Sequence, residues 1–330
     1  MPVHTIDMKR GISPLRDLVS IWRMVRLMIS IRPDIVHSYT PKAGLICMVS
    51  AWLARVPVRV HTFTGLIWPT NVGLKRQLLI NVDRLICSCA THVTPESQGV
   101  RSDLLMGKIT SKPLNLLGYG NIAGIDVEYF SPNNINLLSE AALLKKTYAI
   151  KENDFVYIFI GRLNRDKGVE ELLTAFELLP VNTRLLIAGD FDYTAPLRSI
   201  FLNCLQNHPR IHHLGFLQDV RPSLLLANVL VLPSYREGLP NVILQAGAMR
   251  IPVIASHING CKELIDNDIN GWLVAPRDAS ALADVMKIAL TTSRVKLMEM
   301  GLSSRETIVR KFERSAQMRR LVEFYQSLVL

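Results

Sequence analysis

Short apolar runs alternate with amphipathic segments through the second half of this chain. The runs are rich in Val, Ile and Leu, and the segments between them carry the apolar spacing of helices. Strands that are covered on both faces need no alternation of polar and apolar residues, and a repeated strand–helix pattern is typical of a parallel α/β sheet. The pattern therefore predicts an α/β domain with strands near residues 156–161, 184–189, 211–215, 229–233, 252–255 and 272–275.

One of these units, Val229–Arg250, places a polar loop between its strand and its helix. Asn241 stands in the position of a helix N-cap, before a helical apolar face that ends at Met249. The amide end of this helix lies beyond the carboxyl end of the strand, which favours an anion. Glu237, in the same loop, can accept hydrogen bonds from sugar hydroxyls. Taken alone, Glu237 can also be interpreted as a helix-capping acid beside a turn.

A second strand–loop–helix unit lies upstream, in residues 156–176. Its loop carries Arg162, Arg165 and Lys167. Two or three cations at one strand end can neutralise a diphosphate, Arg as a two-pronged donor and Lys as a point charge. Singly, these residues are typical solvated surface charges, but together with the Glu237 loop they predict a binding site.

The two units together resemble the nucleotide-sugar-binding domain of the retaining glycosyltransferases of family 4, also called group 1 glycosyl transferases, which have the GT-B fold. The motifs are GRLNRDKG at residues 161–168 and EGLPNVILQA at residues 237–246, about 75 residues apart. HSYTPKAG at 37–44, RVHTFTG at 59–65 and GNIAGID at 120–126 extend the resemblance over nearly the whole chain, and bacterial members that build surface polysaccharides on a lipid carrier are similar throughout. The resemblance implies an α/β protein of two Rossmann-like domains that face each other across a cleft.

The resemblance also implies roles for individual residues. Arg162 and Lys167 would stabilise the charge on a leaving diphosphate, and Glu237 would hold sugar hydroxyls, so these three are the catalytic candidates. The family usually has a second Glu at the position of Gln245, where it holds the nucleotide ribose, and Gln loses the charge-assisted bonds. The other donor-binding candidates, of which the second and third would frame the nucleobase, are Gly161, Gly215, Phe216, Gly238, Leu239 and Asn241.

The first half of the chain has a less regular pattern. It predicts strands at residues 3–8, 34–39, 58–63, 91–96 and 116–120. Ser13 and Pro14 open an amphipathic helix that runs to about residue 30, with Leu15, Leu18 and Trp22 on its apolar face. We expect Trp22 and Met24 of this helix in the core or an interface. The acceptor-side candidates are His37, Lys42 and Thr64, where relatives commonly carry a His at the position of Thr64.

The Gly-rich segment 120–126 predicts the domain boundary. We expect an acceptor-side domain at 1–125, a donor domain at 126–307 and a C-terminal helix at 308–330 that packs back on the first domain. The family's first domain begins with two strand–helix units before anything like residues 3–8. Because the first strand of a doubly wound sheet is central, we expect the first domain to be incomplete, either because roughly 60 residues precede Met1 or because the gene product is truncated.

Most of the net charge of +10 lies in the first domain. Residues 1–112 hold about fifteen Lys and Arg against six acids, roughly +9. Clustered cations of this kind can each contribute up to about 1 kcal/mol at an anionic inner-leaflet surface, although solvated helix faces are an alternative. No aromatic-interleaved basic stripe accompanies the charge, so we expect no nucleic acid partner.

Several other classes are disfavoured. The five cysteines are scattered without a C-x-x-C pair, which supports neither a disulfide framework nor a zinc site. Neither G-x-G-x-x-G nor a P-loop motif is present, which argues against a nicotinamide cofactor or a P-loop nucleotide site. The absence of a long apolar run and of a signal-peptide pattern predicts a cytoplasmic protein, peripheral on the inner face of the cell membrane.

The leading hypothesis is a glycosyltransferase of surface polysaccharide biosynthesis. It would move a hexose-type sugar from a nucleoside-diphosphate donor, UDP by preference, to a lipid-linked or saccharide acceptor with retention, and it would need no metal or other cofactor. A truncated, inactive remnant that at most binds nucleotide is the first alternative. A nucleotide-sugar epimerase on the same architecture is the second, although the acid-rich site of an epimerase is not evident.

Overall fold

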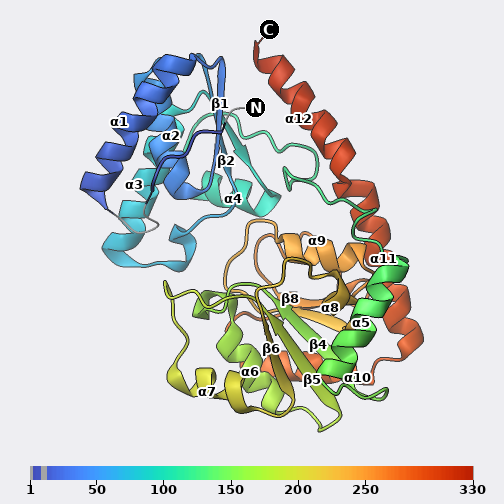
Figure 1. The fold of residues 1–330 in the computed structure, drawn as a ribbon. Helices are drawn as coiled ribbons and strands as arrows, with labels where there is room; N and C mark the ends of the chain where they lie inside the picture. The colour runs from blue at the N-terminus through green and yellow to red at the C-terminus, as the bar shows by residue number, and fades with distance from the viewer. Residues whose placement is uncertain (1–2, 9–12, 330) are drawn as a thin grey trace. The chain divides into compact units, whose positions relative to one another are not determined.

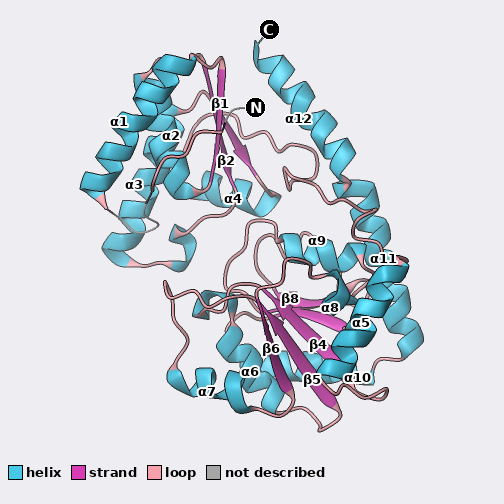
Figure 2. Cartoon of the chain, in the orientation of Figure 1, coloured by secondary structure: helices cyan, strands magenta, loops and turns pink. Residues whose placement is uncertain are grey.

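The computed structural model describes residues 3–8 and 13–329 (Figures 1 and 2). The chain divides into two compact units, one made of the residues up to Ile122 together with those from Met318 onward, the other of Ala123–Gln317. Each unit contains its own parallel sheet.

The division falls at 122/123 and 317/318, whereas the sequence places it at 125/126 and 307/308. Backbone hydrogen bonds give the reason for the difference. The amide of Ile125 donates to the carbonyl oxygen of Phe312 (2.7 Å), and the carbonyl oxygen of Ile125 accepts from the amide of Arg314 (2.9 Å). The end of the Gly-rich linker is thereby attached to the second unit.

The second unit contains a six-stranded parallel sheet in the order β6-β5-β4-β7-β8-β9. All six strands confirm the predicted positions to within a residue. Most of them are buried on both faces, so their apolar runs need no local alternation. The strands are β4 (Phe155–Ile160), β5 (Thr183–Ala188), β6 (Ile211–Gly215), β7 (Val229–Leu232), β8 (Val253–Ser256) and β9 (Gly271–Val274).

Helices connect these strands. They are α5 (Ile135–Thr147), the 3-10 turn η2 (Arg165–Lys167), α6 (Val169–Glu177), α7 (Ser199–Asn207), α8 (Arg221–Leu226), α9 (Asn241–Ala248), α10 (Ala279–Thr291), α11 (Arg294–Phe312) and the start of α12 (Arg314–Val329). The core lies between helices and sheet, where Tyr157, Phe159 and Phe176 are fully buried. The Tyr157 hydroxyl donates to the Met286 carbonyl oxygen at 2.6 Å, so even this buried polar atom has a partner.

The strand order places a particular pair of loops together. From β4 the chain adds β5 and β6 on one side, and β7, β8 and β9 lie on the other, so β4 and β7 are neighbours. Tyr157 of β4 lies opposite Val229 of β7. The loops after β4 and β7 therefore leave the sheet side by side at a topological switch point, where parallel α/β sheets bind ligands.

The first unit contains a three-stranded parallel sheet in the order β1-β2-β3, made of β1 (Ile35–Tyr39), β2 (Val58–Phe63) and β3 (His92–Pro95). The predictions of strands near 34–39, 58–63 and 91–96 are confirmed. The helices are α1 (Pro14–Ile31), α2 (Pro41–Leu53), the 3-10 turn η1 (Trp68–Thr70), α3 (Gly73–Cys89), α4 (Gln98–Met106) and the C-terminal part of α12. Across the described ranges, no helix combines the length and apolarity needed to cross a membrane.

Two strand predictions in this unit are wrong. Residues 3–8 alternate like a strand but form none, since a strand also requires a neighbour to pair with. Residues 116–120 form a turn in which Gly118 has a φ of 61°, outside the strand region. Just before this segment, Leu114 makes an isolated parallel bridge with Val93 of β3.

Of the two α1 side chains expected in the core or an interface, Met24 packs against the cluster of Met28, Ala51 and Val56, whereas Trp22 lies outside the core of this unit. Leu15, Leu18 and Trp22 are 80%, 62% and 57% exposed. The helix packs on α2 through its other side, where Ser20 and Met28 are buried. An apolar helical stripe requires a covering partner, and among the residues that the structure describes none covers these three side chains.

Candidate functional site

Arg162 follows β4 and contacts the loop that follows β5. Its Nη1 donates to Oδ2 of Asp192, and the Arg162 side chain remains 56% exposed while that of Asp192 is only 7% exposed. Burial by itself would raise the pKa of Asp192, but hydrogen bonds from Thr194 and the charge of Arg162 outweigh burial and lower that pKa. The guanidinium is therefore held from one side by an ionised carboxylate and open on the other.

Backbone pairing holds these two loops together. The amide of Leu163 donates to the Asp190 carbonyl oxygen (2.8 Å), and the amide of Asp192 donates to the Leu163 carbonyl oxygen (3.2 Å). Sequence reasoning did not find Asp192. The available signal was an acid in the loop after β5, which pairs in parallel with β4 and so ends at the same edge of the sheet.

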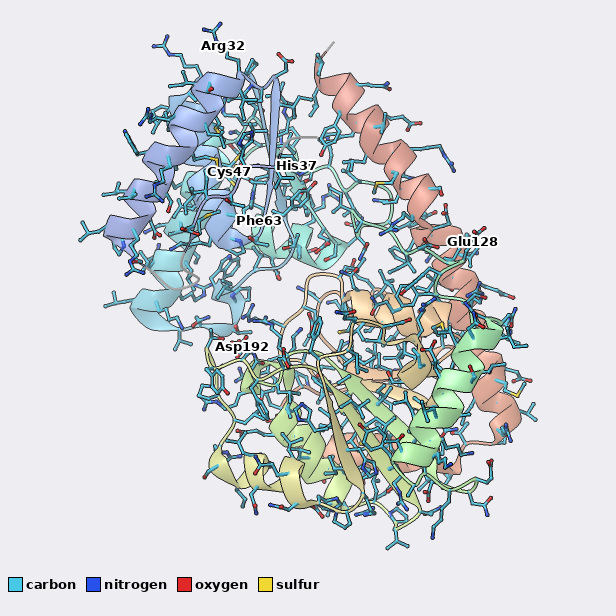
Figure 3. All side chains as sticks on the ribbon, viewed as in Figure 1. Arg32, His37, Cys47, Phe63, Glu128 and Asp192 are labelled. Atoms are coloured by element: carbon cyan, nitrogen blue, oxygen red, sulfur yellow. The ribbon has the colours of Figure 1, made fainter. Side chains whose placement is uncertain are left out.

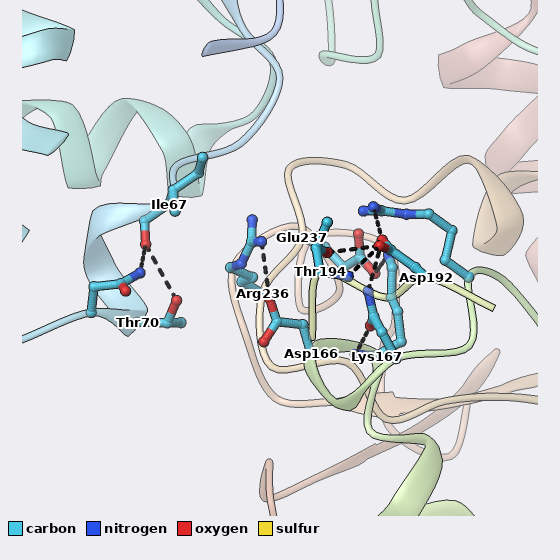
Figure 4. A network of polar contacts seen from close by, with 11 residues as sticks. Ile67, Thr70, Asp166, Lys167, Asp192, Thr194, Arg236 and Glu237 are labelled. Carbon is cyan, nitrogen blue, oxygen red and sulfur yellow. Dashed lines mark hydrogen bonds and ion pairs between the residues drawn. The ribbon is translucent and has the colours of Figure 1, made fainter. Parts of the chain in front are cut away.

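Lys167 and Glu237 join the loops at the switch point. Lys167 Nζ lies 2.6 Å from Glu237 Oε1, and the two side chains are 19% and 12% exposed (Figure 4). An ammonium group has three donors, so Lys167 can keep this contact and still donate to an incoming anion. The structure thus brings together one of the predicted cations and the predicted sugar-binding acid.

The loop that carries Glu237 is fixed by the two residues directly before the acid. The Tyr235 hydroxyl donates to Glu171 Oε1 at 2.5 Å. Arg236 pairs with Asp166 at 3.0 Å (Figure 4). At the start of this loop, a Cβ on Gly168 would lie 2.1 Å from the Pro233 carbonyl oxygen, and Gly168 has a φ of +67°. Only glycine fits there without moving the backbone.

The helix after this loop begins one residue earlier than predicted. Asn241 is the first residue of α9 and Pro240, in an extended conformation, is its N-cap, so the prediction that Asn241 caps the helix is wrong. The reason is that proline fixes its own backbone in a conformation suited to the cap position. The Pro240 side chain has no acceptor for the first amides, so the α9 N-terminus keeps its preference for an anion.

The remaining donor-side candidates surround the same edge of the sheet. Gly161 directly follows β4, and its amide donates to the Ala188 carbonyl oxygen at 2.9 Å. Gly215 ends β6, Phe216 after it is exposed, and Gln245 is half-buried on α9. Gly238 and Leu239 are buried at the approach to α9. All six therefore come from segments that follow or end at the carboxyl side of the strands.

The acceptor-side candidates all lie in the first unit, on separate elements. Both ring nitrogens of His37 in β1 are hydrogen-bonded, one with the Tyr325 hydroxyl (2.6 Å) and the other with Thr62 Oγ1 (2.7 Å). Burial lowers the pKa of His37 to about 4 (Figure 3). Lys42 of α2 forms an ion pair with Asp17 of α1 (2.6 Å). These contacts give His37 and Lys42 structural roles within the unit, and Thr64 is half-buried after β2.

A cavity of about 480 Å³ lies at the opposite end of the second unit's sheet, lined by Phe155, Asn182 and Asn228 near the amino ends of strands. None of the predicted site residues lines it. Within the described part of the chain, no group of three or more His, Cys, Asp or Glu side chains is arranged to hold a metal ion.

Comparison with known proteins agrees with this geometry. A family model for group 1 glycosyl transferases matches residues 141–304, and one for a glycosyl transferase 4-like domain matches residues 1–112. The chain is 29% identical to the Staphylococcus aureus capsular polysaccharide biosynthesis glycosyltransferase CapM over 99% of this chain and 85% of that protein. It is 26% identical to the Escherichia coli UDP-Gal:alpha-D-GlcNAc-diphosphoundecaprenol alpha-1,3-galactosyltransferase over 97% of this chain and 82% of that protein.

Solved structures support the same fold. Anabaena Alr3699/HepE in complex with UDP and glucose superposes with a TM-score of 0.83 at 18% identity, covering 99% of this chain and 86% of that one. Sucrose-phosphate synthase from Thermosynechococcus elongatus gives a TM-score of 0.80 at 21% identity, covering 97% and 80%. Two parallel-sheet units, the donor-side motifs at the switch point and both family models agree: the chain belongs to the family 4 glycosyltransferases, the group 1 glycosyl transferases with the GT-B fold.

Proposed function

We propose that this glycosyltransferase transfers a sugar from a UDP-sugar to a lipid-linked saccharide acceptor, with retention of anomeric configuration, in the biosynthesis of a surface polysaccharide. The observation that carries the proposal is the pairing of Lys167 with Glu237 at the switch point, beside the open guanidinium of Arg162. This arrangement offers positive charge to a diphosphate and a carboxylate to sugar hydroxyls within one site. The names of CapM and of the E. coli galactosyltransferase support the polysaccharide setting and the UDP donor.

The donor chemistry follows from the charges. As the bond between the anomeric carbon and the diphosphate breaks, negative charge grows on the phosphate oxygens. Arg162, Lys167 and the amide end of α9 would stabilise that charge, and fixed donors at a developing charge commonly give the largest share of catalysis. Because these groups already supply the countercharge, we expect no requirement for a metal ion.

Retention requires the acceptor hydroxyl to attack the anomeric carbon from the face that the diphosphate leaves. The new glycosidic bond forms as the bond to the diphosphate breaks, and the hydroxyl proton passes to an oxygen of the leaving phosphate. A dedicated protein base is then unnecessary. Glu237 would orient the sugar through its hydroxyls, and Gln245 would contact the ribose.

The acceptor proposal rests on the first unit and on the relatives. The E. coli relative is named for an acceptor linked to diphosphoundecaprenol, which is a membrane lipid carrier. In this chain α1 exposes Leu15, Leu18 and Trp22, and the Arg26 guanidinium lies 4.8 Å from the Trp22 ring centroid. Apolar and aromatic side chains beside arginines are typical of helices that lie in a membrane interface. We therefore propose a peripheral location on the inner, anionic face of the cell membrane.

Product analysis tests the reaction class. The chain is incubated with a UDP-hexose or UDP-N-acetylhexosamine and a diphosphoundecaprenol-linked acceptor, and the new linkage is identified by NMR. An α-linked product from an α-linked donor supports the proposal. A β-linked product would contradict retention, and release of UDP without a glycosylated product from any acceptor tried would contradict transfer.

A further inference from the structure

A single buried carboxylate, Asp192, organises the loop that carries both diphosphate-binding cations. Its Oδ2 accepts from Arg162 and from Asn164 Nδ2 (3.2 Å), and its Oδ1 accepts from the amide (3.0 Å) and hydroxyl (2.7 Å) of Thr194. Both oxygens are thus hydrogen-bonded, which removes much of the cost of burying the charge. A carboxylate held in this way has one orientation.

Through its contact with Asn164, Asp192 also fixes the part of the loop that carries Lys167. A carboxylate only accepts hydrogen bonds, so it fixes the Asn164 amide with Nδ2 toward Asp192 and Oδ1 toward the backbone. Asn164 Oδ1 in turn accepts from the amide of Lys167 at 3.0 Å. Lys167 Nζ then reaches Glu237. One continuous set of contacts therefore runs from Asp192 to the acid that is proposed to hold the sugar (Figure 4).

The negative charge of Asp192 indicates that this residue orients Arg162 and does not itself favour diphosphate binding. A negative group next to Arg162 opposes the approach of a diphosphate, so it does not serve affinity for the ground state. What it does supply is direction, because a guanidinium anchored through one Nη presents its remaining donors in a fixed plane. Fixed orientation matters more in the transition state, where a displacement of about 1 Å can cost about 10²-fold in rate.

We propose that Asp192 is a positioning residue of the donor site, which acts through Arg162 and, by way of Asn164, on the loop that carries Lys167. The inference rests on the donor chemistry proposed above. It assigns Asp192 no contact with the substrate. Its contribution is the direction in which the two cations meet the leaving diphosphate.

A double-mutant cycle tests this assignment. Asp192→Ala, Arg162→Ala and the double variant are compared for kcat, for donor KM and for UDP affinity by calorimetry. We expect Asp192→Ala to lower kcat about 30-fold while the Kd for UDP changes less than about threefold. In the Arg162→Ala background the same substitution should cost clearly less in kcat than in the wild type, because only the contact through Asn164 to the Lys167 loop is left to lose.

Asp154 provides a matched control in the same unit. It is also a buried acid paired with an arginine, Arg184 at 3.1 Å, but it lies at the amino ends of the strands. Asp154→Ala should lower the thermal midpoint without changing kcat. If Asp192→Ala does not fold, Asp192→Asn replaces it, since the amide can still accept from Thr194 but one of its two terminal atoms no longer accepts a hydrogen bond.

The outcomes are distinguishable. Equal losses of kcat in the wild-type and Arg162→Ala backgrounds, or a loss that follows the thermal midpoint as for Asp154→Ala, would overturn the positioning role while leaving the donor site intact. A folded wild-type chain that neither binds UDP nor transfers sugar would overturn the proposed function and this inference with it.

Discussion

The two units of this chain bury their sheets to different extents. In the second unit every residue of β7 and β8 is buried, whereas in β1 of the first unit only Ser38 is buried and its four neighbours are half-buried. The second unit builds its site from ion pairs and hydrogen bonds between loops that such a covered sheet holds in place. The first unit instead leaves the apolar side chains of α1 exposed. We therefore expect the donor site in the second unit and a contact surface in the first.

The largest effect should follow from removal of the ion pair at the switch point. Lys167→Ala removes one of the groups that stabilise the leaving diphosphate, and kcat should fall about 10²–10³-fold. Steady-state kinetics with a UDP-sugar measures this. Lys145→Ala, which breaks the exposed pair with Glu152 in the same unit, is the control and should leave kcat unchanged. Equal activities of the two variants would contradict the assignment of Lys167.

Gly168→Ala tests whether the rigidity of the second unit comes from backbone packing. The added Cβ would meet the Pro233 carbonyl oxygen at 2.1 Å at a φ of +67°, so the free energy of unfolding should fall by about 3 kcal/mol. Gly215→Ala is matched to it in φ (+68°), but its Cβ meets nothing within 4 Å, and it should cost only about 1 kcal/mol. Urea unfolding measures both variants. Equal costs would show that the close approach is not rigid.

The surface role of the first unit is tested by Leu18→Ser with Trp22→Ser. Both side chains are exposed, so stability should change by less than about 0.5 kcal/mol, while partitioning onto phosphatidylglycerol vesicles should weaken about tenfold. Val181→Ser, an exposed apolar position in the second unit, is the control and should change neither. Met28→Ala, on the buried side of α1, should instead cost about 2 kcal/mol or more of stability. A double variant that unfolds as readily as Met28→Ala would place the stripe in a core.

The smallest effect should be in the pH dependence of the first unit. Burial lowers the pKa of His37 to about 4 and that of His61 to about 3, both from an ordinary value of 6.5. The folded state therefore favours the neutral rings, and this stability is fully present above pH 6.5 and is lost as the pH falls toward 4. His37→Gln cannot take up the proton, so thermal midpoints measured from pH 7 to pH 4 should fall less steeply than in the wild type. Identical slopes would contradict the contribution of His37.

The same difference between the units explains how much the sequence could predict. Strands such as β7 were predicted correctly because a strand buried on both faces is recognisable from its own continuous run of apolar residues. Residues 3–8 carry a strand-like alternation but form no strand, because the decision depends on a neighbour that local sequence does not specify.

The site was predictable in its motifs but not in its contacts. The loops with Arg162, Lys167 and Glu237 carry recognisable spacing, and their meeting follows from strand order. The partner of Arg162 does not, since Asp192 lies 30 residues away and only the pairing of β4 with β5 brings it close. The Asn241 cap was misplaced by one residue because Pro240 takes the extended position itself.

The central claim is a UDP-sugar donor site in the second unit that needs no metal ion. Calorimetric titration of the chain with UDP and with GDP, in the presence of EDTA, tests it most directly, alongside the variant that combines Arg162→Ala with Lys167→Ala. We predict micromolar binding of UDP in preference to GDP, lost in the double variant while its thermal midpoint stays close to that of the wild type. A folded chain that binds neither nucleotide, or binds UDP equally well without the two cations, would contradict the account.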